Sequence, residues 1–589
     1  MQTVPSSSVL CPSSVTSKLF LLATLALTPA LSGAQVIPAP PTPQVGSSNP
    51  ASAEPPVSRP RGNPCIVPLL TAAKFDNFSG VPIHYAPPAA CPGPWAKVVL
   101  TADFTVTAGR QFDRSAWFYL GNVNIFYGTT AEPRHALSPS WHIERNLTDL
   151  TATLRAPQVG LASIGNVVNS TYTGVIYANA ALEFYQATPA QPAPRTPDVV
   201  VGVSSGSGPG TLNTAADKVS QRVLLPRNAE KVYLDVISQS QIGDEFWYFC
   251  VPTQDAQAAA TCGNTAFRET EVTIDGTPAG VAPVYPWIYT GGLDPYLWEP
   301  IVGVQTLNFK PYRVDLTPFA GVLADGAQHT VSISVFNANG YFLATGNLLV
   351  YRDQGSKVVT GGLISNTLTA PSPQVIDGLT TDAAGTISGT VSVDSKRSFA
   401  ISGFLNTSHG RVETTVEQKV DFLNTQAVKV NANSSPDIQN ATQTSTVDSE
   451  TTTRNGYVDE KVATHISFPL TIDFNYTVNA DGSASQVASS DQQYVVREAT
   501  SLNGLALFDS NTKEQVVSND TLLFNANGSL TGPGVGKSTA TYRSRDSRGH
   551  CFSRSLAAAN QVLTAVTDGK ACSEADSGNQ DVNVNEDAQ

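Results

Sequence analysis

The sequence of 589 residues predicts an all-β protein made of sandwich-like domains. Apolar or alternating runs, such as 97–106, 116–126 and 174–185, have the two-residue period and aromatic enrichment of strands. The run 385–393 alternates almost without interruption, and no long amphipathic helical pattern occurs. Because an α/β fold needs helices between its strands, their rarity favours sandwiches of antiparallel strands.

The composition agrees with this fold class. Hydrophobic residues make up 41% of the chain and charged residues only 14%, which suits packed β domains with Thr, Ser and Asn faces. The length exceeds what one hydrophobic core serves, so we expect about two to four domains. The net charge of -13 repels phosphate backbones and anionic lipid, so neither a nucleic-acid partner nor a membrane partner is expected.

Residues 1–34 have the pattern of a secretory signal peptide. Lys18 precedes a short apolar run at 19–27, and the small residues Ser32 and Ala34 lie two positions apart, as a signal-peptidase site requires. The apolar run is too short to span a bilayer comfortably. The acidic, polar C-terminus lacks the hydrophobic tail of a lipid-anchor signal. We therefore expect a secreted, extracellular protein.

Proline-rich segments and shifts in composition divide the rest of the chain. Residues 35–64 are rich in Pro, Ser and Ala and predict an extended, poorly ordered leader. A first β-sandwich is expected over 65–187, and a Pro-rich bridge at 187–197 separates it from a second over 198–352. From 353 to 589 the chain is rich in Thr, Ser, Val, Asn and Gln, which predicts a C-terminal antiparallel β domain with a polar tail.

Cysteines and glycosylation triplets favour an extracellular setting. Six cysteines follow the signal peptide, an even number that is typical of disulfides in a secreted chain. They form three local couples, although the spacing alone leaves the connectivity open: Cys65 with Cys91, Cys250 with Cys262, and Cys551 with Cys572. Nine Asn-x-Ser/Thr triplets predict a glycosylated surface, at Asn77, Asn146, Asn169, Asn406, Asn433, Asn440, Asn475, Asn519 and Asn527.

Two acidic segments are the candidates for chemistry. Residues 109–114 (Gly-Arg-Gln-Phe-Asp-Arg) place Asp113 between two arginines, and residues 243–248 (Gly-Asp-Glu-Phe-Trp-Tyr) place Asp244 and Glu245 beside aromatic rings. A carboxylate among rings is costly to bury unless it is paired or used in catalysis. For Asp113 a structural ion pair between strands is the alternative to catalysis. For Glu245 the alternative is a half-buried sheet edge.

Both segments have strand-like patterns, and alternate side chains of a strand share a face. Glu245 would then share its face with Trp247, and Asp244 would share the other face with Phe246 and Tyr248. Asp113 and Glu245 are far apart in the chain, so they meet only if two folded units pack together.

Other chemistries have little support in the sequence. The seven histidines show no spacing typical of metal ligands and no Cys-x-x-Cys pair occurs, so no metal site is predicted. Assigning the six mature cysteines to disulfides leaves no thiol nucleophile. No Gly-rich loop opens a helix, so no nucleotide or other organic cofactor is expected.

Four segments carry a family resemblance: 103–114, 130–134 (Thr-Ala-Glu-Pro-Arg), 244–248 and 289–298 (Tyr-Thr-Gly-Gly-Leu-Asp-Pro-Tyr-Leu-Trp). In this order they resemble the peptide N-glycosidase A family, the secreted glycopeptide amidases of plants and fungi. The resemblance covers about residues 65–352, and the remaining C-terminal region looks like the more variable tail of the same family.

That family is distantly similar to bacterial peptide N-glycosidase F. The similarity implies two jelly-roll-like β-sandwiches packed side by side, with the site at their interface. An essential Asp in an aromatic-Asp-Arg motif matches Asp113 with Arg114, and a Glu before an aromatic residue matches Glu245. A third acid falls near Asn166, where this chain has no Glu. Glu299 stands where the plant members have a basic residue.

The resemblance implies hydrolysis of the amide between an Asn side chain and the innermost GlcNAc of an N-glycopeptide or glycoprotein, giving Asp and a glycosylamine without a cofactor. Asp113 would activate the water, Arg114 would set the charge of Asp113 and stabilise the oxyanion, and Glu245 would support the chitobiose core. The expected substrate-binding residues are Trp247, Asp244, Asn166, Trp298 and Arg110.

Two other function classes stay open. A non-catalytic secreted lectin or cell-wall glycan-binding protein would hold sugars on the aromatic faces of Trp117, Trp247 and Trp298. A glycosidase would use two carboxylates to cleave a glycosidic bond and would leave the Asn–GlcNAc bond intact.

Overall fold

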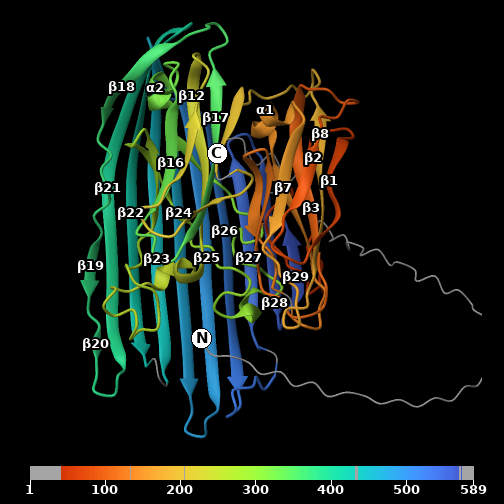
Figure 1. Ribbon diagram of the computed structural model, residues 1–589, viewed down its shortest axis with the longest axis vertical. Helices are drawn as coiled ribbons and strands as arrows, with labels where there is room; N and C mark the ends of the chain where they lie inside the picture. Colours follow the sequence, from red (N-terminus) through yellow and green to blue (C-terminus); the bar gives the residue numbers. More distant parts are fainter. Residues whose placement is uncertain are drawn as a thin grey trace, which may run out of the picture. The chain divides into compact units, whose positions relative to one another are not determined.

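The computed structural model describes residues 42–132, 134–204, 206–431, 435–532, 534–569 and 572. The expected signal peptide, residues 35–41 of the leader and the triplet at Asn433 lie outside this part of the chain. The described residues belong to one compact unit, 36–589. Its strands pair in antiparallel sheets, which confirms the all-β prediction (Figure 1). Over the described ranges, no helix is long and apolar enough to cross a membrane.

The first sandwich packs two four-stranded sheets, in the orders β1-β8-β3-β6 and β2-β7-β4-β5. The Phe104 ring lies between them, 6.1 Å from Phe118 and 5.3 Å from Trp141. The predicted strand run 116–126 is a hairpin, because Gly121, with a φ of 60°, turns the chain. The strands are β1 (Cys65–Phe75), β2 (Val81–Tyr85), β3 (Trp95–Val106), β4 (Ser115–Leu120), β5 (Val123–Thr129), β6 (Ser140–Asn146), β7 (Gln158–Ile164) and β8 (Ile176–Gln186).

The second sandwich combines a five-stranded sheet, β10-β17-β12-β15 with β9 also paired to β17, and a four-stranded sheet, β11-β16-β13-β14. A turn at Asp275 and Gly276 joins β13 to β14, and both residues have the positive φ that such hairpin turns need (49° and 81°). The strands are β9 (Val199–Val203), β10 (Gly210–Leu212), β11 (Val219–Val223), β12 (Ala229–Ser240), β13 (Glu269–Ile274), β14 (Thr277–Pro283), β15 (Tyr312–Asp315), β16 (His329–Phe336) and β17 (Phe342–Arg352).

The C-terminal region forms one 12-stranded antiparallel sheet, drawn in green to blue in Figure 1. Strands β21 to β26 have 19–21 residues each, and buried side chains alternate along them with more exposed ones, so the sheet has one buried face. The strands are β18 (Thr360–Asn366), β19 (Gln374–Asp377), β20 (Thr380–Thr381), β21 (Ile387–Thr407), β22 (Gly410–Val430), β23 (Asp437–Asn455), β24 (Val458–Val478), β25 (Ala484–Leu502), β26 (Leu505–Phe524), β27 (Lys537–Asp546), β28 (Cys551–Ala559) and β29 (Val562–Asp568).

Helical structure in the described residues is limited to single turns. The expectation of a strand over 244–248 is wrong, because the Glu245 N–H donates to Ile242 O (3.2 Å) and closes a helical turn there. The α-helical segments are α1 (Thr151–Leu154) and α2 (Ala320–Leu323), and the 3₁₀ turns are Thr148–Leu150, Ile242–Asp244, Trp247–Phe249, Pro295–Trp298 and Thr317–Phe319.

A continuous hydrophobic core joins the second sandwich to the 12-stranded sheet. Trp247 packs against Phe422 of β22, with ring centroids 6.2 Å apart, and Tyr285 packs edge-on against Phe468 of β24 at 4.8 Å. The sheet therefore buries the loops of the second sandwich instead of forming a separate core of its own.

Buried amide side chains of the sheet hold the same loops. Gln492 Nε2 donates to Pro286 O (2.7 Å), and Gln492 Oε1 accepts from Val304 N (2.8 Å). Asn424 Nδ2 donates to Tyr248 O (3.0 Å). These bonds satisfy backbone groups that would otherwise be buried without partners.

The described part of the leader, residues 42–64, is ordered against the fold, so the expectation of a poorly ordered leader is wrong there. Ala51 is buried and pairs with Ile301 in a parallel bridge. Arg59 forms an ion pair with Glu144 of β6 (2.7 Å). We call residues 42–64 the strap.

The start of the strap is hydrogen-bonded to the last strand of the sheet. Gly46 N donates to Leu563 O (2.8 Å), and Leu563 N donates to Ser47 O (2.9 Å). Ser48 Oγ donates to Gln561 O (3.0 Å). The two ends of the described chain are thus joined.

The predicted cysteine couples are confirmed as disulfides: Cys65–Cys91, Cys250–Cys262 and Cys551–Cys572. Glycosylation stays a prediction. Among the described triplets, five asparagines are exposed, Asn77, Asn169, Asn406, Asn519 and Asn527, and three are half-buried, Asn146, Asn440 and Asn475.

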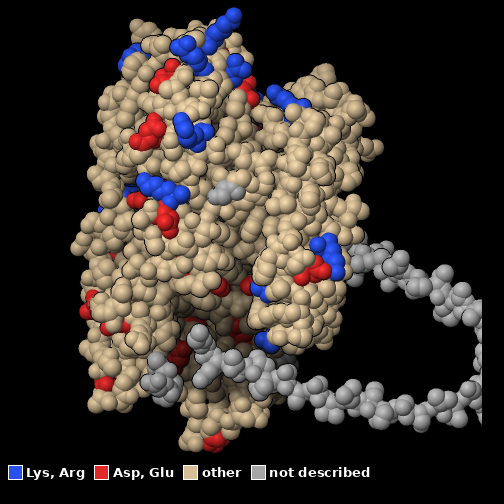
Figure 2. All heavy atoms as spheres, viewed as in Figure 1, with Lys and Arg blue, Asp and Glu red and all other residues tan. Residues whose placement is uncertain are grey.

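Charged side chains are sparse on the face of the molecule shown in Figure 2. Lys and Arg occur there as separate side chains and not as one broad basic area, and acidic side chains are visible inside a hollow of the same face. The distribution matches the low charged content of the sequence.

Candidate active site

The two sandwiches contact each other beside the candidate acids. Gln239 Nε2, near the end of β12, donates to Ser115 Oγ at the start of β4 (3.0 Å), and Tyr119 OH donates to Thr345 Oγ1 of β17 (2.8 Å). Asp113 lies two residues before β4, and Glu245 lies on the turn that follows β12. The contact therefore brings the two segments singled out in the sequence to one place.

Asp113 is half-buried at this contact. Its Oδ2 accepts a hydrogen bond from the backbone N–H of Gly291 (2.8 Å), which belongs to a loop of the second sandwich. Burial raises the pKa of Asp113, while the Gly291 N–H and the Arg114 guanidinium act in the opposite direction. A carboxyl from one sandwich is thus positioned by the backbone of the other.

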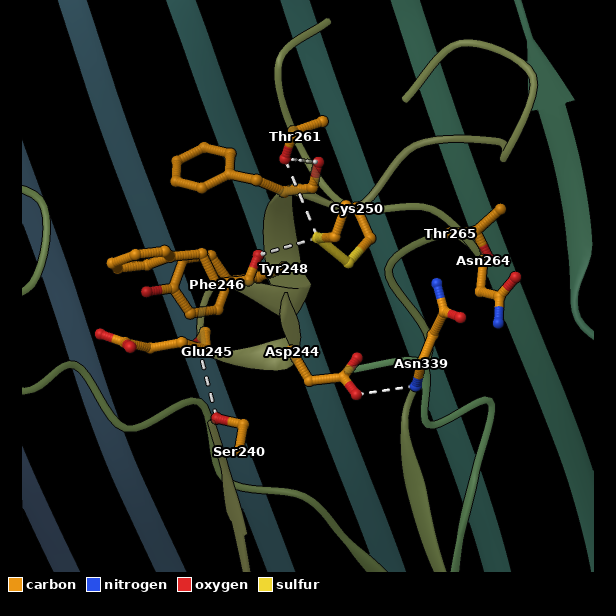
Figure 3. Close-up of a disulfide and its surroundings, with 12 residues drawn as sticks. Ser240, Asp244, Glu245, Phe246, Tyr248, Cys250, Thr261, Asn264, Thr265 and Asn339 are labelled. Atoms are coloured by element: carbon orange, nitrogen blue, oxygen red, sulfur yellow. Dashed lines mark hydrogen bonds between the residues drawn. A yellow bond between two sulfur atoms is a disulfide. The ribbon is translucent and has the colours of Figure 1, made fainter. Parts of the chain in front are cut away.

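Glu245 is half-buried on the 3₁₀ turn. Burial raises the pKa of Glu245 to about 7, and the charge of Asp113 adds to the shift, so the two carboxyls lie within electrostatic reach of each other. Figure 3 shows Glu245 on the same side of the turn as Phe246 and Tyr248, with Asp244 pointing to the opposite side. The faces expected from strand alternation are therefore wrong.

Phenol groups surround Glu245. The pKa values of Tyr248, Tyr289 and Tyr341 are raised by burial first and by the charge of Glu245 second. The Asp113 charge also acts on Tyr289, whose hydroxyl donates to Ser240 O (2.5 Å). Tyr289 therefore lies within reach of both acids.

Asp244 does not lie in a substrate site, contrary to the expectation. Its side chain and that of Arg268 are both fully buried (0% exposed) and form an ion pair at 2.7 Å. The second carboxylate oxygen of Asp244 accepts from Asn339 N (2.7 Å; Figure 3). Arg268 also donates to the backbone oxygens of Thr265 (2.7 Å) and Phe267 (3.0 Å). The buried charges are fully paired, so Asp244 is structural.

Three further expected substrate contacts are core side chains: Trp247, Trp298 and Asn166 are 0%, 1% and 0% exposed. Trp298 Nε1 donates to Gly292 O (2.9 Å) and so positions the turn next to Gly291. Asn166 Nδ2 donates to Phe75 O (2.7 Å). None of the three side chains has a face free for a sugar.

Because Trp247 and Trp298 are buried, two of the three aromatic faces that the lectin alternative requires are not available to a sugar. The third, Trp117, is half-buried and packs edge-on against Tyr127, with ring centroids 5.9 Å apart. The tryptophans therefore build the core and not a sugar-binding surface.

Arg110 and Arg114 flank a pair of aromatic rings at the site. The Phe112 and Tyr172 rings are 5.3 Å apart, and each guanidinium carbon lies 5.6–5.8 Å from both ring centroids. Arg114 Nη2 also donates to Gln111 Oε1 (2.8 Å). Arg110 is exposed and Arg114 half-buried, so both can meet a ligand.

Glu132, which lies beside Asp113, is not among the site residues predicted from the sequence. A Cβ on Gly291 would collide with Glu132 Oε2 and would lie 3.2 Å from Asp113 Oδ2, so the Gly291 backbone lies against both acids. Glu132 N donates to Thr290 Oγ1 (2.8 Å). The family-like segment 130–134 contains Glu132, but its distance in sequence from the Gly291 loop concealed the contact.

Glu299, the residue that departs from the plant pattern, forms an ion pair with Arg134 Nε (2.5 Å). Burial raises the pKa of Glu299 to about 7, and Arg134 opposes the shift. The charge of Glu299 reaches Glu132 and raises the pKa of Glu132. Glu299 therefore belongs to the border of the same acidic cluster.

Within the described part of the chain, no group of three or more His, Cys, Asp or Glu residues could hold a metal ion. The acids, a backbone N–H and a guanidinium converge instead between two sandwiches. This set can activate a water, donate a proton and stabilise a developing oxyanion.

The fold and the site together define an all-β hydrolase with a carboxyl cluster between two sandwiches. Residues 56–369, more than half of the chain, match the family described as peptide N-acetyl-β-D-glucosaminyl asparaginase amidase A, and the chain belongs to that family. It is an amidase that acts on N-glycopeptides.

The chain is 24% identical over 551 residues to peptide-N4-(N-acetyl-β-glucosaminyl)asparagine amidase A of Prunus dulcis, covering 89% of this chain and 93% of the relative. Among solved structures, PNGF-II matches 49% of this chain and 65% of its own, with 11% identity and a TM-score of 0.35. PNGase F, a glycosylasparaginase from Flavobacterium meningosepticum, matches 49% of this chain and 96% of its own, with 13% identity and a TM-score of 0.31.

Proposed function

We propose that the protein is a secreted glycoamidase that hydrolyses the amide between the Asn side chain and the innermost GlcNAc of N-glycans, releasing a glycosylamine and leaving Asp. The observation that carries the proposal is the meeting of Asp113, Glu245 and the Gly291 N–H at the contact of the two sandwiches. Family membership supports the same reaction.

Asp113 is the base in this proposal. An unactivated amide needs a positioned water and a group that takes its proton during attack on the carbonyl carbon. The Gly291 N–H holds one oxygen of Asp113, which leaves the other free for a water. Because burial raises the pKa of Asp113, its carboxylate is a better base than one in water.

Arg114 and Glu245 support the reaction. Gln111 anchors the Arg114 guanidinium beside Asp113, where its charge stabilises the oxyanion that forms on the amide carbonyl. Glu245, with a pKa raised to about 7, is largely protonated in mildly acidic solution. It therefore binds hydroxyl and acetamido groups of the chitobiose core as a neutral carboxyl.

The substrate in this proposal is an N-glycopeptide or glycoprotein, and neither a nucleic acid nor a membrane takes part. The disulfides and the N-terminal signal pattern support secretion. The chemistry assigned to the side chains uses no metal or organic cofactor.

Replacing Asp113 by Asn tests the proposal. D113N should lower turnover of an N-glycopeptide by about 10²–10⁴-fold while the thermal midpoint stays near that of the wild type, since only the base is removed. Mass spectrometry of the peptide measures conversion of Asn to Asp.

The control is D275N, which changes an exposed turn carboxylate far along the second sandwich and should keep full activity. Wild-type turnover in D113N would remove Asp113 from the mechanism. Binding of glycopeptide by the wild type without conversion of Asn to Asp would favour the lectin function instead.

A further inference from the structure

Glu132 is a half-buried carboxyl in the acidic cluster to which the proposed reaction assigns no role. Its Oε2 and Asp113 Oδ2 both lie within 3.2 Å of one point, the position that a Cβ of Gly291 would take. The two carboxylate oxygens therefore lie on the same side of Gly291 and close to one another. A water or an amide nitrogen that contacts one of them lies next to the other.

The surroundings of Glu132 restrict its movement. Its backbone N–H donates to Thr290 Oγ1, and Thr290 Oγ1 donates to Thr130 O (3.0 Å). Both partners of this hydroxyl belong to the Glu132 segment, and Thr290 directly precedes Gly291, so the two bonds join the backbone of that segment to the Gly291 loop. Such a fixed arrangement is what proton transfer to a reacting atom requires.

We propose that Glu132 is the general acid of the reaction, donating its proton to the amide nitrogen that leaves with the sugar. The inference rests on the proposed function, because it concerns the same bond. It assigns opposite tasks to Asp113 and Glu132, which lie on the same side of Gly291.

In the proposed reaction, protons pass between the water, Asp113, Glu132 and the leaving nitrogen. A water oxygen forms a bond to the amide carbonyl carbon, and Asp113 takes one proton of that water. The carbon–nitrogen bond then breaks, its electron pair goes to nitrogen, and the Glu132 carboxyl supplies the proton that completes the amine of the glycosylamine. The proton held by Asp113 passes back to Glu132, which restores both groups.

The charges around Glu132 favour the protonated form. Burial raises the pKa of Glu132 to about 8, and the negative charges of Asp113 and Glu299 add to the shift. The Asp113 backbone N–H and the Arg114 guanidinium oppose it. Burial raises the pKa of Asp113 as well, but the Gly291 N–H and the Arg114 guanidinium favour its ionised form. The hydrogen bond from Gly291 N–H to Asp113 thus favours Glu132 as the acid and Asp113 as the base of the pair.

A comparison of two substrates tests the assignment in E132Q. One substrate is an N-glycopeptide, and the other is its ester analogue, in which oxygen replaces the scissile nitrogen and leaves without full protonation. E132Q should lower kcat for the amide by about 10²–10⁴-fold and for the ester by less than about tenfold, because only the amide requires a general acid.

The matched control is E498Q, which replaces another buried glutamic acid, hydrogen-bonded to Ser510 in the 12-stranded sheet, and should keep both activities. Equal losses on amide and ester in E132Q, or amide turnover within tenfold of wild type, would overturn the role. Failure of the wild type to convert Asn to Asp would instead refute the proposed function, so the two failures are distinguishable.

Discussion

Asp244 and Glu245 are neighbours with opposite environments. Asp244 is fully buried with Arg268, whereas Glu245 is half-buried beside phenol rings and within reach of Asp113. The buried ion pair fixes the turn from one side, and the Cys250–Cys262 disulfide follows directly after it (Figure 3). A structural acid thus positions the candidate catalytic acid next to it.

Replacing Asp244 by Ala should destabilise the protein by about 3–5 kcal/mol, because the Arg268 charge stays buried without a partner. Chemical denaturation measures the free energy of unfolding, and glycopeptide turnover should fall as the turn with Glu245 shifts. D275A, which removes an exposed partner of His329, should lower the free energy of unfolding by less than about 1 kcal/mol. An equally small cost for D244A would mean that the buried pair does not hold the turn.

The residues that could be predicted from the sequence were those carried by a local motif. Asp113 and Arg114 are adjacent in such a motif, and the charge of Asp113 acts on Glu245, while the roles that the resemblance implied stay predictions. Trp247 and Asp244 could not be placed, because strand alternation was assumed where the chain makes a 3₁₀ turn. Glu132 was missed because its contact with Asp113 passes through the Gly291 loop, which is distant in sequence.

At the scale of elements, the long strands of the C-terminal sheet support the site loops of the second sandwich. Gln492 of β25 bonds to Pro286 and Val304, on either side of the Gly291 loop, and Gln486 Nε2 of the same strand donates to Asp294 Oδ2 (3.0 Å). The region that resembled a variable tail therefore takes part in positioning the backbone N–H that holds Asp113.

Replacing Gln492 by Leu should lower the free energy of unfolding by about 1–3 kcal/mol, since two buried backbone groups lose their hydrogen-bond partner. The value of kcat/KM for a glycopeptide should also fall, because the loop with Gly291 is released from the sheet. Unfolding curves and steady-state kinetics measure the two effects. Q515L, which removes bonds only to the side chain of Asp491, should leave kcat/KM unchanged, and an equal loss there would contradict the argument.

The strand content of the C-terminal region followed from its alternating pattern, but the architecture did not. Periodicity over 385–393 indicates a strand, and the actual strand β21 runs for 21 residues because each neighbour continues the same alternation. Nothing local in the sequence reveals that the buried face of this sheet packs on the second sandwich. That pairing depends on side chains hundreds of residues apart.

At the scale of the whole molecule, many carboxyls retain their protons to unusually high pH. Burial raises the pKa of five half-buried or buried glutamic acids, to about 8 for Glu132 and to about 7 for Glu245, Glu269, Glu299 and Glu498. In the unfolded chain the pKa of a Glu is about 4.3. Between about pH 4.3 and about pH 7–8, the folded protein therefore binds more protons than the unfolded chain.

The stability linked to these carboxyls is complete below about pH 4.3 and is lost as the pH rises to about 7–8. We expect the thermal midpoint to fall from pH 5 to pH 8, which differential scanning fluorimetry across a buffer series measures. The pKa of Glu144 is lowered to about 2, so its contribution to the stability of the protein is lost only on acidification below this window. E498Q should flatten the slope, and a midpoint that rises with pH would contradict the linkage.

The strap has a consequence for the order of synthesis. Its hydrogen bond from Ser48 to Gln561 spans 513 positions of the chain, so the first folded residues wait for almost the last ones to leave the ribosome. Contacts of such sequence separation close late in folding. Until β29 is made, residues 46–48 of the strap lack these partners, although Arg59 can already pair with Glu144 of the first sandwich. Nascent chains interrupted before that strand should therefore be more sensitive to proteases around residues 46–48 than the finished protein.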